Sequence, residues 1–123
     1  MNKGTISSDF DGVLHDYADG WTGYRPAGKA IEGSLEFVGE LIAEGYEVIV
    51  SSCRAYTLIG RVGIADWLLE YGFPRLEVTC EKPHAIAYID DRAHRFEGDF
   101  GALKTKMLRP VWFSVPKEPE FGG

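Results

Sequence analysis

Apolar residues recur every three or four positions along two stretches of the chain, residues 26–45 and 57–71. This spacing is typical of helices that bury one face. We expect Pro26 to open the first helix, because proline fits the first turn, and Gly45 to end it. Gly72 follows the second stretch and stops it. The apolar faces should carry Ile31, Leu35, Val38, Leu41 and Ile42 in the first helix, and Leu58, Val62, Ala65 and Leu69 in the second.

Four short apolar runs lie before, between and after these helices, at residues 5–8, 47–50, 76–79 and 85–89. Runs of this length that end in polar residues are typical of buried strands. Strands that alternate with helices form a parallel sheet, because a parallel connection needs a crossover. The pattern therefore predicts an α/β protein, a three-layer sandwich with a mainly parallel, Rossmann-like sheet.

The length of 123 residues is enough for one domain with a single core. We assign residues 1–115 to this domain and residues 116–123 to a flexible tail. Within the domain, a helix over residues 98–108 and a last strand at 111–113 should follow the fourth apolar run. No run approaches the roughly 20 apolar residues of a membrane span, and the N-terminus does not resemble a secretory signal. We therefore expect a cytoplasmic protein without membrane contact.

The charge and the cysteines narrow the partners further. A net charge of −6 leaves no excess of cations for general nucleic-acid binding. A small basic cluster, Arg92, His94 and Arg95, leaves a local contact with a polyanion open, and the oligomeric state is also open. The two cysteines, Cys53 and Cys80, match no zinc or redox spacing and are expected to be reduced and buried.

Polar side chains follow three of the predicted strands, at the point where each strand ends. They are Asp9 and Asp11, Ser51 and Ser52, and Asp90 and Asp91. The carboxyl ends of parallel strands meet at one edge of a sheet, and ligands bind at that edge. We therefore expect these side chains to form one site.

The chemistry of this site follows from its residue types. Four aspartates held close together repel one another unless a cation lies between them, and hard oxygen ligands favour magnesium. Lys82 adds a positive charge and Ser52 a hydroxyl donor. Such a set suits a phosphoryl group, because the cations neutralise its oxygens while a carboxylate attacks phosphorus. The predicted substrate is therefore a phosphorylated molecule and the predicted cofactor is Mg²⁺.

Four motifs in this order resemble those of the haloacid dehalogenase superfamily, most of whose members are phosphatases. The matching residues are Asp9 and Asp11 in Asp9-Phe10-Asp11-Gly12-Val13-Leu14, Ser52 in Val50-Ser51-Ser52-Cys53-Arg54, Lys82 in Glu81-Lys82-Pro83, and Asp90-Asp91 in Tyr88-Ile89-Asp90-Asp91-Arg92. The resemblance covers residues 5–92. It implies a magnesium-dependent phosphomonoester hydrolase that acts through an aspartyl-phosphate intermediate.

The resemblance also implies a role for each motif residue. Asp9 would be the nucleophile, and Asp11 would be the general acid and then the general base. Ser52 and Lys82 would hold the phosphoryl oxygens. The metal ligands would be Asp9, the backbone carbonyl of Asp11 and Asp90, with the neighbouring Asp91 as a further candidate.

Two assignments at the second motif stay open. Ser51 and Ser52 both follow the strand, and we favour Ser52 because related sequences often read Thr-x-Arg here, with Ser52 two residues before Arg54. Arg54 either binds the substrate phosphate or pairs with a carboxylate on a helix. His15 and His84 lie near the predicted site without an assigned role.

The gaps between the motifs leave no room for the cap domain that family members usually carry. By resemblance the chain is a capless member, whose open site could accept a large substrate or borrow a lid from a second subunit. A nucleotide or nucleic-acid-end phosphatase is an alternative, supported by Trp21, Tyr24 and the basic cluster. A non-catalytic phosphoacceptor or binding module is another, although its acceptor aspartate would follow a middle strand. A metal-nucleotide glycosyltransferase is excluded because the chain has no room for an acceptor domain.

Overall fold

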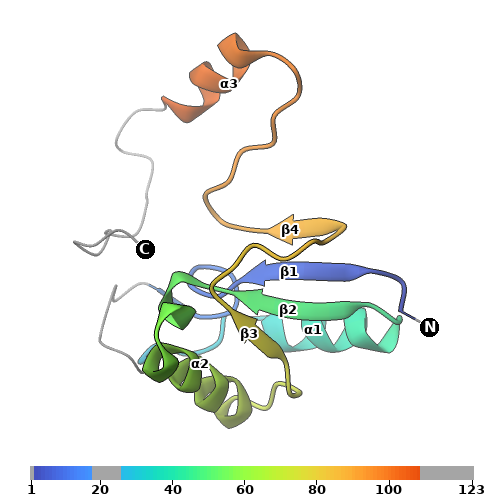
Figure 1. The fold of residues 1–123 in the computed structure, drawn as a ribbon, viewed down its shortest axis with the longest axis vertical. Coiled ribbons are helices and arrows are strands. Elements are labelled where there is room, and N and C mark those ends of the chain that lie inside the picture. The colour runs from blue at the N-terminus through green and yellow to red at the C-terminus, as the bar shows by residue number, and fades with distance from the viewer. Residues whose placement is uncertain (1, 18–25, 109–123) are drawn as a thin grey trace.

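A computed structural model describes residues 2–17 and 26–108 of the chain (Figure 1). The elements follow in the order strand, helix, strand, helix, strand, strand, helix. The strands are β1 (Thr5–Asp9), β2 (Glu47–Ser51), β3 (Glu77–Thr79) and β4 (Ala87–Ile89). The helices are α1 (Ser34–Ala43), α2 (Leu58–Glu70) and α3 (Phe100–Met107), and a short 3₁₀ helix, η1 (Cys53–Tyr56), precedes α2.

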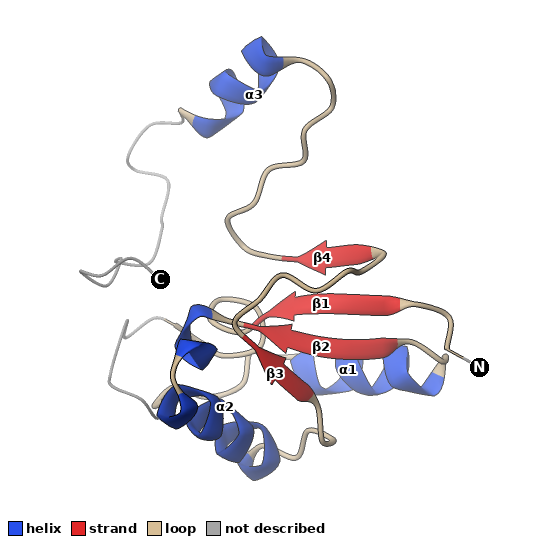
Figure 2. Ribbon diagram, viewed as in Figure 1, coloured by secondary structure: helices blue, strands red, loops and turns tan. Residues whose placement is uncertain are grey.

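The four strands form one parallel sheet in the order β3-β2-β1-β4. α1 connects β1 to β2 and packs on β2, and α2 connects β2 to β3 and packs on β3. The connection from β3 to β4 is a loop without a helix (Figure 2). This is the α/β arrangement with a parallel, Rossmann-like sheet that the sequence predicts, and it brings the carboxyl ends of all four strands to one edge.

The core lies between the sheet and the two crossover helices. Its buried members are Phe10, Leu14, Val38, Val48, Val50, Ala55, Ile64, Trp67, Leu68 and Phe73. Phe10 and Leu14 belong to this core although they follow the end of β1. Their burial holds the turn after Asp9, which includes Asp11, against the core. Each fully buried side chain of this size contributes about 1.5–3 kcal/mol to folding, which fixes the turn firmly.

The first helix begins later than predicted, at Ser34 instead of Pro26. Residues 28–31 pair instead with residues 14–16: Lys29 accepts a backbone bond from Asp16 at 2.8 Å, and Ile31 donates one to Leu14 at 2.8 Å. Gly33 then turns the chain with a φ of 87° and caps the helix. The prediction was wrong because a long-range backbone pairing competes with helix formation here. The predicted end at Gly45 is confirmed, since α1 stops at Ala43.

The second helix has the predicted extent but buries a different face. Leu58, Val62 and Leu69 are exposed, and the buried residues are Gly60, Gly63, Ile64, Trp67 and Leu68. Gly60 lies so close to the backbone carbonyl of Arg54 that no side chain fits there. Two glycines on the buried face give no apolar signal, so the spacing of the larger residues pointed to the wrong side.

The C-terminal part departs from the sheet. α3 falls within the predicted range 98–108, buries none of its residues, and stands apart from the sheet in Figure 1. The predicted strand at 111–113, the tail 116–123 and the aromatic residues Trp21 and Tyr24 lie outside the described residues.

Two smaller expectations are also resolved. Cys53 and Cys80 are both free, as expected, but they are exposed, so the prediction of buried thiols was wrong. Each follows the end of a strand, where the chain leaves the core. Among the described helices, none is both long and apolar enough to cross a membrane.

Candidate active site

Three carboxylates meet at the carboxyl edge of the sheet. Asp9 is the last residue of β1, and Asp90 and Asp91 directly follow β4, which is the neighbour of β1. One carboxylate oxygen from each of the three lies within 4.8 Å of the others. Parallel pairing of Ser8 with Ile89 sets this meeting, because both strands then end at the same level. The structure thus brings together three of the four predicted metal ligands through their side chains.

Asp9 is held in an environment that opposes its ionisation. Burial, followed by repulsion from Asp90, Asp91 and Asp11, raises its pKa from 3.8 to about 7. The backbone N–H of Phe10 donates to Asp9 Oδ1 at 2.8 Å and offsets part of this rise. A cation among the three carboxylates would remove the repulsion and favour the ionised, nucleophilic form.

Asp11 is only two residues further on, yet its carboxylate lies in the opposite environment. Its Oδ2 accepts from Arg54 Nε at 2.7 Å, and its Oδ1 lies 2.7 Å from His15 Nδ1. Burial acts to raise the pKa of Asp11, but the hydrogen bonds from His15 and Arg54 and the charge of Arg54 outweigh it and lower the pKa. Asp11 is therefore ionised at neutral pH, whereas the raised pKa of Asp9 favours its protonated form.

Arg54 is buried beside Asp11 and forms an ion pair with it. It belongs to η1, directly after β2, and it is 3% exposed. Its guanidinium carbon lies 5.8 Å from the ring centroid of the buried Tyr17. Of the two roles left open for Arg54, pairing with a carboxylate is the one seen here, although the carboxylate belongs to the site and not to a helix. Its predicted contact with a substrate phosphate stays a prediction.

The two serines after β2 have different hydrogen bonds. The Ser51 hydroxyl donates to the Glu81 carbonyl at 2.7 Å and so ties the end of β2 to the loop before β4. The Ser52 hydroxyl accepts from the Arg54 backbone N–H at 3.2 Å and is the cap of η1. An accepting hydroxyl still has its own hydrogen to donate. The hydroxyl hydrogen of Ser51 is therefore used within the fold, whereas that of Ser52 can be donated to a ligand.

Lys82 is not joined to the acidic cluster. Its ammonium nitrogen stands 4.7 Å from the ring centroid of Tyr88, and none of the ion pairs between described residues links it to Asp9. Tyr88 in turn donates its hydroxyl to the Pro83 carbonyl at 2.7 Å. The side chain of Lys82 is exposed and long, so a rotation about its own bonds would be needed to bring its charge to the carboxylates.

Two backbone features hold the carboxylates of Asp90 and Asp91 in place. Asp90 Oδ1 accepts from the N–H groups of Arg92 and Ala93, at 2.7 and 3.2 Å, which fixes the turn after β4. Gly12 has a φ of 83°, and a side chain at this position would collide with the Asp91 carboxylate. Only glycine fits both demands, because φ values in this range strain other residues.

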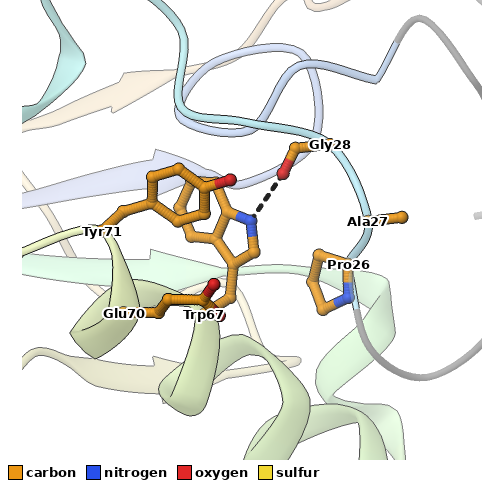
Figure 3. A pocket seen from close by; sticks show the side chains of 6 residues that line it. All are labelled: Pro26, Ala27, Gly28, Trp67, Glu70 and Tyr71. Atoms are coloured by element: carbon orange, nitrogen blue, oxygen red, sulfur yellow. Dashed lines mark hydrogen bonds between the residues drawn. The ribbon is translucent and has the colours of Figure 1, made fainter.

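A pocket of about 310 Å³ lies beside the site and is shown in Figure 3. It is lined by Pro26, Ala27, Gly28, Trp67, Glu70 and Tyr71. No predicted site residue lines it. The pocket is therefore separate from the acidic cluster. Two of its lining residues, Gly28 and Trp67, also contact His15, the partner of Asp11.

Sequence reasoning left His15 without a role, yet it is the second partner of Asp11. The available signal was its spacing, because His15 follows Asp11 by four residues within the same turn. The Phe10 carbonyl accepts from the N–H groups of Leu14 and His15, both at 3.0 Å, so the chain coils back on itself. His84, by contrast, is exposed.

Comparison with known proteins supports the fold and goes no further. No family model matches the chain, and no curated protein matches it. A solved structure that is similar to it is described as the structure of the conserved protein coded by locus from Bacteroides thetaiotaomicron. The two share 22% identity over 93% of this chain and 100% of that chain, with a TM-score of 0.59. The likeness is one of fold, and the resemblance to the haloacid dehalogenase superfamily stays a prediction.

Proposed function

We propose that the chain is a magnesium-dependent phosphomonoester hydrolase in which Asp9 attacks phosphorus. The observation that carries the proposal is that two aspartates only two residues apart have opposite electrostatic environments, which raise the pKa of Asp9 and lower that of Asp11. Asp9 joins Asp90 and Asp91, and Asp11 joins Arg54 and His15. Two carboxyl groups whose pKa values are pushed apart are typical of a division between acid-base and other roles.

The residues present fit a magnesium ion. Asp9, Asp90 and Asp91 would hold it, together with the backbone carbonyl of Asp11. The fit rests on three hard oxygen donors within 4.8 Å of one another and on the raised pKa of Asp9, about 7, which marks a negative charge that lacks compensation. When bound, the ion would supply positive charge to the carboxylates and to the phosphoryl oxygens.

The chain's own residues would carry out two chemical steps. In the first, a carboxylate oxygen of Asp9 forms a bond to phosphorus, the ester P–O bond breaks, and the leaving oxygen takes a proton from Asp11. In the second, water attacks the phosphorus of the aspartyl-phosphate and gives its proton to Asp11. The P–O bond to Asp9 then breaks and inorganic phosphate leaves. Two protonation states of Asp11 alternate, and the enzyme returns to its starting form.

Asp11 must be protonated for the first step, although it is ionised in the free protein. The negative charge of a phosphate bound beside it would raise its pKa and favour uptake of a proton. For the second step the ionised form is the one required, and the bonds from Arg54 and His15 favour that form. The same two bonds keep the carboxylate from turning away.

Binding of the phosphoryl group falls to Ser52 and Lys82. Ser52 would donate its hydroxyl hydrogen, and Lys82 would turn from the Tyr88 ring toward the phosphoryl oxygens. Asp90 and Asp91 are exposed, which supports an open site and a substrate of considerable size. Two free, exposed cysteines are typical of a reducing compartment, so we also propose that the protein works in the cytoplasm.

The experiment is hydrolysis of an aryl phosphate with and without magnesium, by the wild type and by Asp9→Asn. We expect magnesium-dependent turnover in the wild type and none in the variant. Asp66→Asn, the same chemical change at an exposed position of α2, is the matched control and should keep full activity. Absence of turnover with aryl phosphates, nucleotides and phosphorylated oligonucleotide ends would contradict the proposal. A long-lived aspartyl-phosphate without turnover would instead identify a phosphoacceptor switch.

A further inference from the structure

We propose that His15 is a positioning residue, which holds Asp11 in one orientation for proton transfer and is itself held by the backbone of Gly28. This inference rests on the proposed function, since it assigns the support of the acid-base residue in that reaction. It is carried by the contacts around the imidazole ring. These contacts come from three separate parts of the chain.

The imidazole of His15 is buried and packs against two aromatic side chains. Its ring stacks on Phe10 with a centroid distance of 5.0 Å and an angle of 3° between the planes. Trp67 meets it edge-on at 5.4 Å. The residue is 1% exposed. Rotation of the ring would require the surrounding aromatic side chains to move, so its orientation is fixed by packing.

Hydrogen bonds at both nitrogens then fix where the proton lies. The backbone N–H of Gly28 donates to His15 Nε2 at 3.0 Å. An amide N–H can only donate, so Nε2 has to be the accepting, unprotonated nitrogen. In the neutral ring the proton is therefore on Nδ1, which lies 2.7 Å from Asp11 Oδ1 and donates to it. Without the Gly28 contact either tautomer would be allowed, and one of them would present a lone pair to the carboxylate.

Gly28 is suited to this task for steric and for polar reasons. A side chain there would collide with the Asp16 carbonyl and would lie 2.9 Å from His15 Nε2. Its own carbonyl accepts from Trp67 Nε1 at 2.8 Å, the bond drawn in Figure 3. α2 thereby holds Gly28, Gly28 holds His15, and His15 holds Asp11. Sequence reasoning could not see this chain of contacts, because it joins residues far apart in the sequence.

The geometry has a consequence for Asp11. Each of its oxygens has one fixed donor, His15 at Oδ1 and Arg54 at Oδ2. A carboxylate oxygen has a second lone pair, which remains for the proton that passes to or from the substrate. Loss of the His15 bond would leave only the hydrogen bond from Arg54 to Oδ2. The carboxylate could then rotate about its Cβ–Cγ bond. A misplacement of about 1 Å is sufficient to slow a reaction by about 100-fold.

The test uses two replacements that differ only in where they place an amide. Asparagine puts its N–H near the position of Nδ1, within reach of Asp11, whereas glutamine puts it near Nε2, within reach of Gly28. Alkyl phosphates need a proton on the leaving oxygen, and aryl phosphates with acidic phenols need it far less. We expect His15→Ala and His15→Gln to slow alkyl phosphate hydrolysis by about 100-fold and aryl phosphate hydrolysis by less than about threefold. His15→Asn should recover most of the loss.

Val38→Ala, a change in the core on α1, is the control for lost stability and should slow both esters equally. Equal losses on both esters in His15→Ala, or a failure of His15→Asn to recover activity where the wild type is active, would overturn the positioning role alone. A wild type that hydrolyses neither ester would overturn the proposed function and this role with it.

A second measurement does not depend on activity. The chain has three histidines, and the ring nitrogens of His15 can be assigned by their loss in His15→Asn. Their ¹⁵N chemical shifts in the metal-free wild type should show a protonated Nδ1 and an unprotonated Nε2. A proton on Nε2 would overturn the inference.

Discussion

Replacement of Asp9 by asparagine should stabilise the metal-free protein at alkaline pH, although it removes the proposed nucleophile. Burial and the neighbouring carboxylates raise the pKa of Asp9 to about 7, against 3.8 for an unhindered group. The folded protein therefore binds a proton on Asp9 that the unfolded chain has already lost between these two pH values. Stability falls with rising pH wherever the folded state binds more protons, so Asp9 destabilises the fold progressively from about pH 4 to about pH 7.

The size of the effect follows from the same two pKa values. At about 1.4 kcal/mol for each pH unit, a pKa of about 7 in place of 3.8 corresponds to about 4 kcal/mol once Asp9 is fully ionised. Asp9 is only partly buried, and screening by solvent reduces this to about 2–3 kcal/mol. Asparagine has nearly the same shape, cannot ionise, and can still accept from the Phe10 N–H. Asp9→Asn should therefore lack the free-energy cost of a buried, ionised carboxylate.

Urea unfolding in the presence of a chelator measures the difference directly. The free energies of unfolding of the wild type and Asp9→Asn should be similar at about pH 4 and should differ by about 2–3 kcal/mol at about pH 8, in favour of the variant. Asp66→Asn, an exposed control, should stay within about 0.5 kcal/mol of the wild type at both pH values. Magnesium at about 1,000 times its Kd should reverse the order at alkaline pH, because the ion binds the folded wild type and stabilises it by about 4.1 kcal/mol.

Two results would refute this reasoning. A difference between wild type and Asp9→Asn that stays constant from acid to alkaline pH would show that the charge of Asp9 is not the cause. A variant that magnesium stabilises as much as the wild type would show that Asp9 is not a ligand.

Two further predictions concern the residues around the acidic cluster. Gly12→Ala should lower the free energy of unfolding by about 1–3 kcal/mol, because of its φ of 83°, and should remove most of the stabilisation by magnesium, because its methyl group displaces the Asp91 carboxylate. Urea unfolding with and without magnesium measures both, and an unchanged gain from magnesium would exclude Asp91 from the site. Ser52→Ala should lower kcat/KM for an aryl phosphate by about 10-fold or more, as expected for a lost hydrogen bond to a charged group, and Ser51→Ala should lower it less. The reverse order would assign the phosphate donor to Ser51.

The sheet and the location of the site could be predicted from the sequence because both depend on local signals. Short apolar runs that end in polar residues mark the strands. As the pattern indicates, β1 ends at Asp9, and β4 ends at Ile89, directly before Asp90. Parallel pairing then requires the strand ends to meet at one edge. The grouping of Asp9, Asp90 and Asp91 follows from these two steps without knowledge of any contact.

The errors in the two helices and the missing role of His15 share a different cause, which is that backbone contacts leave little trace in side-chain patterns. Residues 26–33 have helical spacing, but residues 28–31 pair with residues 14–16 instead. Gly60 marks the buried face of α2 through the absence of a side chain, which a search for apolar residues overlooks. His15 obtains its orientation from the backbone of Gly28, thirteen residues away.

The turn after β1 explains how two identical side chains, two residues apart, come to have opposite electrostatic environments. Asp9 still belongs to β1 and therefore faces the end of its neighbour β4, where two further acids lie. The Phe10 side chain enters the core and its carbonyl gathers the N–H groups that follow, so the chain reverses before Asp11 can continue along the strand. Asp11 thereby points toward η1 on the other side, after β2, where Arg54 is buried. The difference in pKa between the two aspartates thus arises from the sheet order β2-β1-β4, which places a cation on one side of β1 and anions on the other.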